Sequence, residues 1–311
     1  MGSERVEIAP GLELSIRRWD AAPPHADAAP APATPPDADA APAPATPPDA
    51  PTVPFLLVHG LSSNARTWEG VAAILAALGH PVVAVDLRGH GLSDRPDEGY
   101  DVATVAGDVA RLIDRLELDR PVVAGQSWGG NVVLQLAADH PSAVRGVACV
   151  DGGLIELAET FPDWAACAEA LAPPPLEGMP AVELEARIRS AHPDWSDAGV
   201  AATMGNFVVR ADGTVAPRLS RPHHMTVLRG LWEHRPSVLL AGIGVPALFA
   251  LADTGDADWT AIKRATAERA LAAMPTARVR WFAPADHDIH VQQPAELAGV
   301  LHDATLDGPF A

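Results

Sequence analysis

Cysteine and long hydrophobic runs are both scarce in this sequence. Only Cys149 and Cys167 occur among the 311 residues, too few for a disulfide framework, and no histidine stands near them at ligand spacing. We expect two buried free thiols and no metal site. No apolar run reaches the roughly 18 residues that a membrane-spanning helix needs. The charged start of the chain lacks the apolar segment of a secretion signal, so we expect a cytoplasmic protein.

Positive charge is scarce as well. The chain has 22 lysine and arginine residues against 40 aspartate and glutamate residues, a formal net charge of −18. An acidic protein is repelled by nucleic acid and by anionic membrane surfaces. We therefore expect neither as a partner. The net charge says little about the substrate, because a pocket can differ from the mean surface. The 48% apolar and 20% charged residues are ordinary for a globular protein.

Large side chains are nearly absent from residues 20–52. A twelve-residue unit of Ala, Pro, Asp and Thr occurs twice in tandem there, at 27–38 and 39–50. Such a segment cannot form a core, and its prolines disfavour helix and sheet, so an extended, disordered linker is predicted. We interpret it as an insertion tolerated in an enlarged hairpin loop, between strands at 12–19 and 53–59. A docking site for a proline-recognising partner and a spacer are the alternatives.

The remaining chain alternates short apolar strands with amphipathic helices. This order predicts an α/β fold, with a mostly parallel central sheet and helices on both faces. From 153 to 243 the alternation breaks, and helical and hairpin patterns predict a mainly helical cap. The core would then be 1–152 and 244–311. The predicted core strands are 82–85, 121–124, 144–150, 247–251 and 279–282, the core helices 105–116, 128–139, 260–274 and 294–302, and the cap elements a hairpin at 207–216 and helices at 181–191 and 223–234.

The motif with the clearest chemical meaning is Gly125-Gln-Ser-Trp-Gly129, which follows a predicted strand and opens a predicted helix. In that context the chain turns tightly and holds Ser127 in a strained conformation at the end of the sheet. Gly125 and Gly129 fit because their neighbours crowd the turn. The new helix directs unpaired N–H groups and its positive dipole end at the serine. The motif predicts that Ser127 is a nucleophile.

A serine hydroxyl needs a base to take its proton. In this arrangement the base is expected after the last strand, where Asp286-His-Asp-Ile-His290 follows 279–282. We predict His287 as the base, because it comes first after the strand. His290 is the alternative.

The third member is a carboxylate that orients the imidazole and stabilises its charged form. It is expected after the strand at 247–251, where Asp256 and Asp253 both occur. Asp151, directly after the strand at 144–150, is a third candidate. We favour Asp256, then Asp253, then Asp151, and spacing alone does not decide between them.

An oxyanion formed at the carbonyl needs two backbone N–H donors. One is predicted to be Trp128, the residue after the nucleophile. The other is predicted to be Leu61, in the loop after the first buried strand, where Gly60 permits the backbone to bend. His59 in that loop is interpreted as a structural residue that bonds neighbouring loops.

Together these residues resemble the α/β-hydrolase superfamily. The resemblance is carried by Val58-His-Gly60, by Asp86-Leu-Arg-Gly-His-Gly-Leu-Ser-Asp-Arg-Pro96, by the segment around Ser127, and by Asp286-His287 ahead of Pro294. It implies an α/β-hydrolase fold, the catalytic roles given above, no cofactor, and structural roles for Asp86 and Arg88 in tying loops behind the oxyanion strand. Epoxide hydrolases and haloalkane dehalogenases of this fold carry Asp at the nucleophile position, so Ser127 argues against them.

The predicted function is hydrolysis of a small, fairly apolar carboxylic ester or lactone through an acyl-enzyme on Ser127. A carbon–carbon bond hydrolase of diketone-like substrates and a ligand-binding receptor on the same fold are the alternatives. The cap tryptophans Trp164, Trp195 and Trp232 could line an apolar pocket or hold the cap together. The sequence leaves the acyl group, the alcohol and the oligomeric state open.

Overall fold

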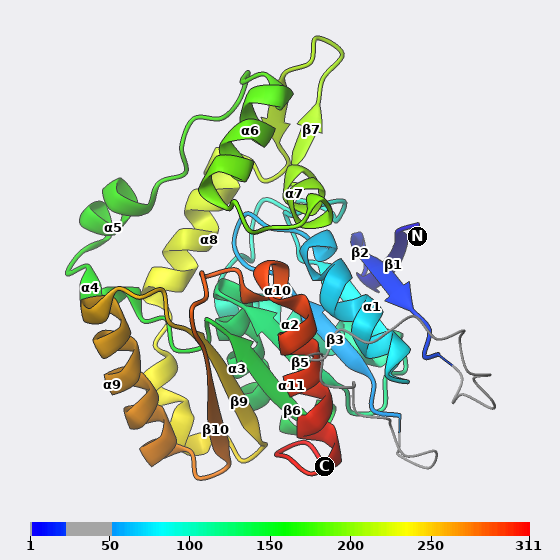
Figure 1. The fold of residues 1–311 in the computed structure, drawn as a ribbon, viewed down its shortest axis with the longest axis vertical. Helices are drawn as coiled ribbons and strands as arrows, with labels where there is room; N and C mark the ends of the chain where they lie inside the picture. Colours follow the sequence, from blue (N-terminus) through cyan, green and yellow to red (C-terminus); the bar gives the residue numbers. More distant parts are fainter. Residues whose placement is uncertain (1, 23–51) are drawn as a thin grey trace, which may run out of the picture.

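The chain is organised around an eight-stranded sheet with the order β1-β2-β4-β3-β5-β6-β9-β10 (Figure 1). A computed structural model describes residues 2–22 and 52–311; the predicted tandem repeat lies outside the described residues. All strands from β4 to β10 in this order are parallel, whereas β2 pairs antiparallel with both of its neighbours, β1 and β4. The predicted mostly parallel α/β sheet is confirmed. Its strands are β1 (Glu4–Ala9), β2 (Leu12–Trp19), β3 (Phe55–Val58), β4 (Val82–Asp86), β5 (Val122–Gln126), β6 (Gly146–Val150), β9 (Ala247–Ala252) and β10 (Ala277–Phe282).

Helices cover both faces of this sheet, as predicted. In β3, Leu56 and Val58 pack into a core with the helices of one face, while Phe55 and Leu57 pack into a second core with those of the other. Alternate residues of a strand point to opposite faces, so a strand between two cores is apolar throughout. The helices of the first face are α2 (Val102–Arg115), α3 (Trp128–Asp139) and α9 (Ala257–Ala273), and those of the second are α1 (Glu69–Ala77), α10 (Ile289–Gln292) and α11 (Pro294–Leu306).

The predicted hairpin between 12–19 and 53–59 is wrong. β2 pairs antiparallel with β1 and β4, and β3 pairs parallel with β4 and β5, so β4 lies between them. The burial patterns explain the difference. All residues of β3 are buried, which suits a central strand with parallel neighbours, whereas β2 is partly exposed and lies next to the edge strand.

The segment between β6 and β9 forms a largely separate group of elements beyond one end of the sheet (Figure 1). The helices expected at 181–191 and 223–234 are present, and the expected hairpin is the antiparallel pair β7 and β8. Helix α8 packs against α2 of the core and against α4 and α5 of its own segment. The elements are α4 (Leu157–Thr160), α5 (Trp164–Leu171), α6 (Ala181–Ala191), α7 (Asp197–Met204), β7 (Phe207–Val209), β8 (Val215–Pro217) and α8 (Arg221–Glu233).

Asp86 and Arg88 both tie parts of the core together. Only Asp86 does so at the loop behind the oxyanion strand, where the resemblance implied both. Asp86 accepts hydrogen bonds from Ala65 N–H at 2.7 Å and Leu92 N–H at 2.9 Å, so it does hold the segment after β3. Arg88 instead binds the fully buried Asp108 of α2 in a bidentate pair, at 2.5 and 2.7 Å. It therefore ties the loop after β4 to a helix.

Arg88→Met is expected to lower the free energy of unfolding by about 3 kcal/mol, because the buried Asp108 carboxylate loses its bidentate partner and keeps only the half-exposed Arg111, at 2.7 Å, as an ion-pair partner. The control is Arg187→Met, which removes an exposed pair with Glu183 on α6 and should change stability by less than about 1 kcal/mol. Denaturant titration of both variants measures the difference. Equal, small effects would show that the buried pair contributes little.

Cys149 and Cys167 are both free and buried, as predicted. Within the described ranges, no helix is long and apolar enough to cross a membrane.

Candidate active site

Ser127 lies in a tight turn between β5 and α3. Its backbone has φ 54° and ψ −122°, a conformation that is strained for any residue other than glycine. A Cβ atom on Gly125 would lie 2.2 Å from the Gly129 oxygen, and one on Gly129 would lie 2.4 Å from the His59 oxygen. The turn therefore requires both glycines, for the crowding that the sequence predicted.

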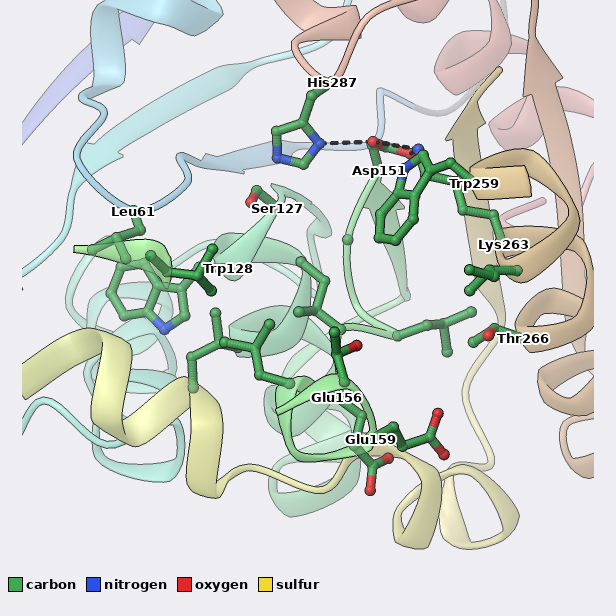
Figure 2. Close-up of a pocket in the computed structure, with 18 of the residues that line it drawn as sticks. Leu61, Ser127, Trp128, Asp151, Glu156, Glu159, Trp259, Lys263, Thr266 and His287 are labelled. Carbon is green, nitrogen blue, oxygen red and sulfur yellow. Dashed lines mark hydrogen bonds and ion pairs between the residues drawn. The ribbon is translucent and has the colours of Figure 1, made fainter. Parts of the chain in front are cut away.

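His287 lies in the loop between β10 and α10 and faces the same cavity as Ser127 (Figure 2). Its Nδ1 donates a hydrogen bond to Asp151 Oδ2 at 2.7 Å. His290 lies elsewhere, 1% exposed, with its ring centroid 4.6 Å from that of Trp68. The structure thus brings His287, and not His290, to the cavity that Ser127 lines.

The structure pairs His287 with Asp151, the third candidate for the carboxylate, and not with Asp256, the first choice. Asp256 caps α9 instead, accepting a hydrogen bond from Trp259 N–H at 2.9 Å. Asp253 accepts bonds from Gly255 N–H at 3.0 Å and from the Thr260 hydroxyl at 2.9 Å. Both carboxylates thus stabilise the loop after β9 and the start of its helix.

Strand order explains why Asp151 reaches the histidine. β6 is the direct neighbour of β5, and Ser127 N–H donates to the Val150 oxygen at 3.0 Å, so the residue after β6 emerges beside the serine. Asp151 has φ 42°, in the left-handed region. Gly152 follows, where a Cβ atom would lie 2.1 Å from the backbone oxygen of Ser127.

Lys263 is a further residue of this site that the sequence reasoning missed. Its Nζ lies 2.7 and 2.8 Å from the two carboxylate oxygens of Asp151 and 3.0 Å from the Ala252 oxygen. Burial alone would raise the pKa of Asp151. The hydrogen bonds and charges of His287 and of Lys263 lower that pKa, and together they hold it below its usual value. The available signal was helical spacing, since Trp259, Lys263 and Thr266 recur on the one face of α9 that lines the cavity.

The pKa of His287 is raised above its ordinary value. Burial acts to lower it, but the hydrogen bond and charge of Asp151, together with the charge of Asp288, outweigh burial; Lys263 acts to lower it. The His287 side chain is half exposed, and it lines the cavity. An imidazole held by a carboxylate at Nδ1 and open at Nε2 can accept a proton from a hydroxyl group in the cavity.

The two backbone groups expected to bind an oxyanion both belong to residues that line the cavity, Leu61 and Trp128. Trp128 is the first residue of α3, so its N–H has no acceptor within the helix. At Gly60 the structure shows close packing, and not the backbone bend that was predicted, as the reason for a small residue. A Cβ atom there would lie 2.3 Å from Gln126 Oε1 and 3.1 Å from the Ser127 Cβ, so a side chain at position 60 would displace the Gln126 side chain and press on Ser127.

Histidines fix the loop that carries Leu61. His59 donates from Nδ1 to the Gly60 oxygen at 2.7 Å and accepts at Nε2 from Leu87 N–H at 3.0 Å, which confirms its structural role. His90 and His224, which the sequence reasoning missed, both bind Ser62: His90 Nε2 accepts from its N–H at 3.3 Å, and His224 Nδ1 lies 2.7 Å from its hydroxyl. The cap helix α8 thus contacts this loop directly.

The cavity has a volume of about 570 Å³ and lies between the sheet, α9 and the cap. Of the predicted cap tryptophans, none lines it. Trp164 and Trp232 lie against each other, with ring centroids 6.1 Å apart, and Trp195 stacks on His192 at 3.8 Å, so they hold the cap together. The large apolar residues that do line it are Leu61, Trp128, Leu154, Ile155, Leu157, Leu171, Leu228, Leu231, Leu251, Trp259 and Ile262.

Comparison with known proteins gives matches in sequence and in fold. Residues 53–195 match the family model described as the alpha/beta hydrolase fold. An uncharacterized protein of Mycobacterium tuberculosis is 41% identical over 98 residues, 32% of this chain and 28% of that protein. The soluble epoxide hydrolase of Corynebacterium sp. is 37% identical over 111 residues, 35% of this chain and 38% of the enzyme. These matches span only about a third of the relatives' own length.

Similarity in fold extends over nearly the whole chain. The crystal structure of E-2-(acetamidomethylene)succinate hydrolase has a TM-score of 0.72 at 22% identity, covering 97% of this chain and 98% of that one. Its low identity supports a shared fold only. With the sheet order, the turn at Ser127 and the match over 53–195, the conclusion is that this chain has the α/β-hydrolase fold.

Proposed function

We propose that this chain is a serine hydrolase, in which Ser127 is the nucleophile, His287 the general base and Asp151 the carboxylate that orients it. The observation that carries the proposal is the 2.7 Å hydrogen bond between His287 Nδ1 and Asp151, in a cavity that Ser127 also lines. A carboxylate at Nδ1 fixes the tautomer in which Nε2 is free to accept a proton.

The reaction follows from these positions. Ser127 Oγ attacks the substrate carbonyl while His287 Nε2 takes the hydroxyl proton, and the carbonyl oxygen becomes an oxyanion. The N–H groups of Leu61 and Trp128 would stabilise that oxyanion. Collapse of the intermediate releases the alcohol, which takes the proton from His287 and leaves an acyl group on Ser127. Water then attacks the acyl group by the same steps, and the acid leaves.

The substrate is proposed to be a small, fairly apolar carboxylic ester or lactone. A volume of about 570 Å³ with leucine, isoleucine and tryptophan on its walls suits an apolar acyl or alcohol group. We further propose that residues 153–243 act as a cap, because Leu157 on α4 and Leu228 on α8 line the cavity opposite the core. Serine in place of aspartate at position 127 favours this reaction over epoxide opening.

The proposal is tested by a series of p-nitrophenyl esters of increasing acyl length, with fluorophosphonate labelling mapped by mass spectrometry. We expect many turnovers per enzyme, a preference for medium-length acyl chains, and one labelled residue, Ser127. Binding without turnover would favour a receptor, and a label on another residue would contradict the assignment.

The pH dependence gives a prediction for Lys263. Only neutral His287 accepts a proton, so kcat/KM should fall as the pH decreases through its pKa, which lies above the ordinary value of about 6.5. Lys263 acts to lower that pKa. Lys263→Met should therefore move the midpoint to higher pH, besides lowering activity through a looser Asp151.

Arg264→Met is the control for this shift, measured as kcat/KM against pH. It also removes one positive charge, from the residue that follows Lys263 on α9. Arg264 pairs with Asp253, at 3.5 Å, whereas Lys263 pairs with Asp151. We expect no shift of the midpoint in this variant. Equal shifts in both variants would mean that the charge of the whole helix, and not contact with Asp151, sets the pH range.

A further inference from the structure

We infer that the cavity accepts uncharged acyl groups and rejects acyl groups that carry a free carboxylate. This inference rests on the proposed function and narrows its substrate class. It follows from how the charged residues of the cavity are placed.

Lys263 offers no free positive charge. It is the only lysine or arginine that lines the cavity among residues 2–22 and 52–311. An ammonium group has three N–H donors, and Lys263 has three close acceptors, the two oxygens of Asp151 and the oxygen of Ala252, within 3.0 Å. Its side chain is only 14% exposed. A substrate carboxylate could bind Lys263 only by displacing Asp151, which orients His287, or the backbone oxygen of Ala252.

The histidines of the cavity do not supply a positive charge either. His224 lines it from α8, and burial lowers its pKa to about 4, so the ring is neutral near pH 7. His287 must be neutral to act as a base, and its Nδ1–H is already bound to Asp151. With His287 neutral, as catalysis requires, the cavity therefore has no free cation among its described residues that could bind an anionic substrate.

Two carboxylates line the cavity at the end away from His287. Figure 2 shows Glu156 and Glu159 at that end, with apolar side chains between them and Ser127. Glu156 lies 3.8 Å from Arg235 and Glu159 lies 3.3 Å from Arg269, but neither arginine is among the residues that line the cavity. The acidic groups face the cavity while their partners lie outside it.

The consequence is a cavity that selects by charge. A carboxylate on the acyl chain would enter an apolar region without a partner, which is unfavourable. If the chain were longer, its carboxylate would approach Glu156 and Glu159, and like charges would repel it. A methyl or methyl ester group at the same position meets neither obstacle.

Three p-nitrophenyl esters test this: the hexanoate, the methyl adipate and the hydrogen adipate. The last two share a six-carbon acyl chain and differ at its end by one methyl group and one charge. We expect kcat/KM for the hydrogen adipate to be at least about 100-fold below that for the methyl adipate. The hexanoate gives the rate for an unsubstituted chain.

Charge variants locate the selection. Glu159→Lys should raise the ratio of hydrogen adipate to methyl adipate kcat/KM by about fivefold, because it replaces a like charge with an opposite one at an exposed position. Glu169→Lys makes the same charge change on an exposed residue of α5 that does not line the cavity, and should leave the ratio unchanged.

The outcomes separate the inference from the proposed function. Equal kcat/KM for the two adipates would overturn the inference while supporting ester hydrolysis. The same rise in ratio for both glutamate variants would also overturn it, since net charge alone would then explain the selection. If none of the three esters were hydrolysed, the proposed function would be overturned, and this inference with it.

Discussion

Ser127→Ala is expected to lower kcat/KM for ester hydrolysis by about four to six orders of magnitude, and to abolish fluorophosphonate labelling. The variant retains the cavity and the pair of His287 and Asp151, but it has no oxygen to form the acyl-enzyme. Alanine fits the space of the serine side chain, so the fold should persist. The strained backbone at φ 54° belongs to the tight turn that Gly125 and Gly129 make possible, and it does not depend on the hydroxyl group.

Activity and stability should therefore separate in this variant. We expect its thermal unfolding to match that of the parent chain closely, with ester hydrolysis lost. Ser190→Ala on α6, outside the cavity, is the control and should hydrolyse esters normally. Undiminished labelling of Ser127→Ala would mean that another residue is the nucleophile.

Much of this fold could be predicted from the sequence, because its central strands lie between two cores. The run Phe55–Val58 is apolar throughout and became a central strand. Helix α1 was not predicted, and it shows where prediction from the pattern of apolar residues fails. Its sequence, Glu69-Gly-Val-Ala-Ala-Ile-Leu-Ala-Ala77, has almost no polar residues to mark a solvent face, so the helical period is hard to detect.

The candidate site was predictable only where its residues follow from local context. A strand, a tight turn with two glycines and a helix identify Ser127, and the place after the last strand identifies His287. The carboxylate depends on which neighbouring strand delivers it, because both β6 and β9 lie between β5 and β10 in the sheet. Lys263 and His224 reach the site from helices far away in the sequence. Helical spacing along α9 is the one local signal for Lys263, and no local motif marks His224.

Asp151→Asn is expected to lower kcat/KM by about 10,000-fold. Asparagine keeps the size of the side chain, but its amide cannot fix the imidazole tautomer as a carboxylate does, and the neutral group no longer stabilises the charged imidazole. Asp256→Asn should have little effect, because asparagine caps a helix as well as aspartate does. Asp253→Asn keeps the oxygen that accepts from Gly255 and Thr260, so its effect should also be small.

Steady-state kinetics of the three variants decide between the loops after β6 and β9. If Asp256→Asn showed the largest decrease in kcat/KM, the loop after β9 would be the one that supplies the carboxylate during turnover. Equal, mild losses at all three positions would mean that His287 works without a carboxylate partner.

Lys263 complicates the result at Asp151, and a double variant resolves it. Asp151→Asn leaves the ammonium group of Lys263 close to His287 without a counter-charge, which by itself lowers the pKa of the imidazole. In Asp151→Asn with Lys263→Met that charge is absent. If loss of the tautomer is the main defect, the double variant should be as inactive as Asp151→Asn alone. Recovery of most of the activity would show instead that the unpaired lysine, and not the missing carboxylate, had inactivated the single variant.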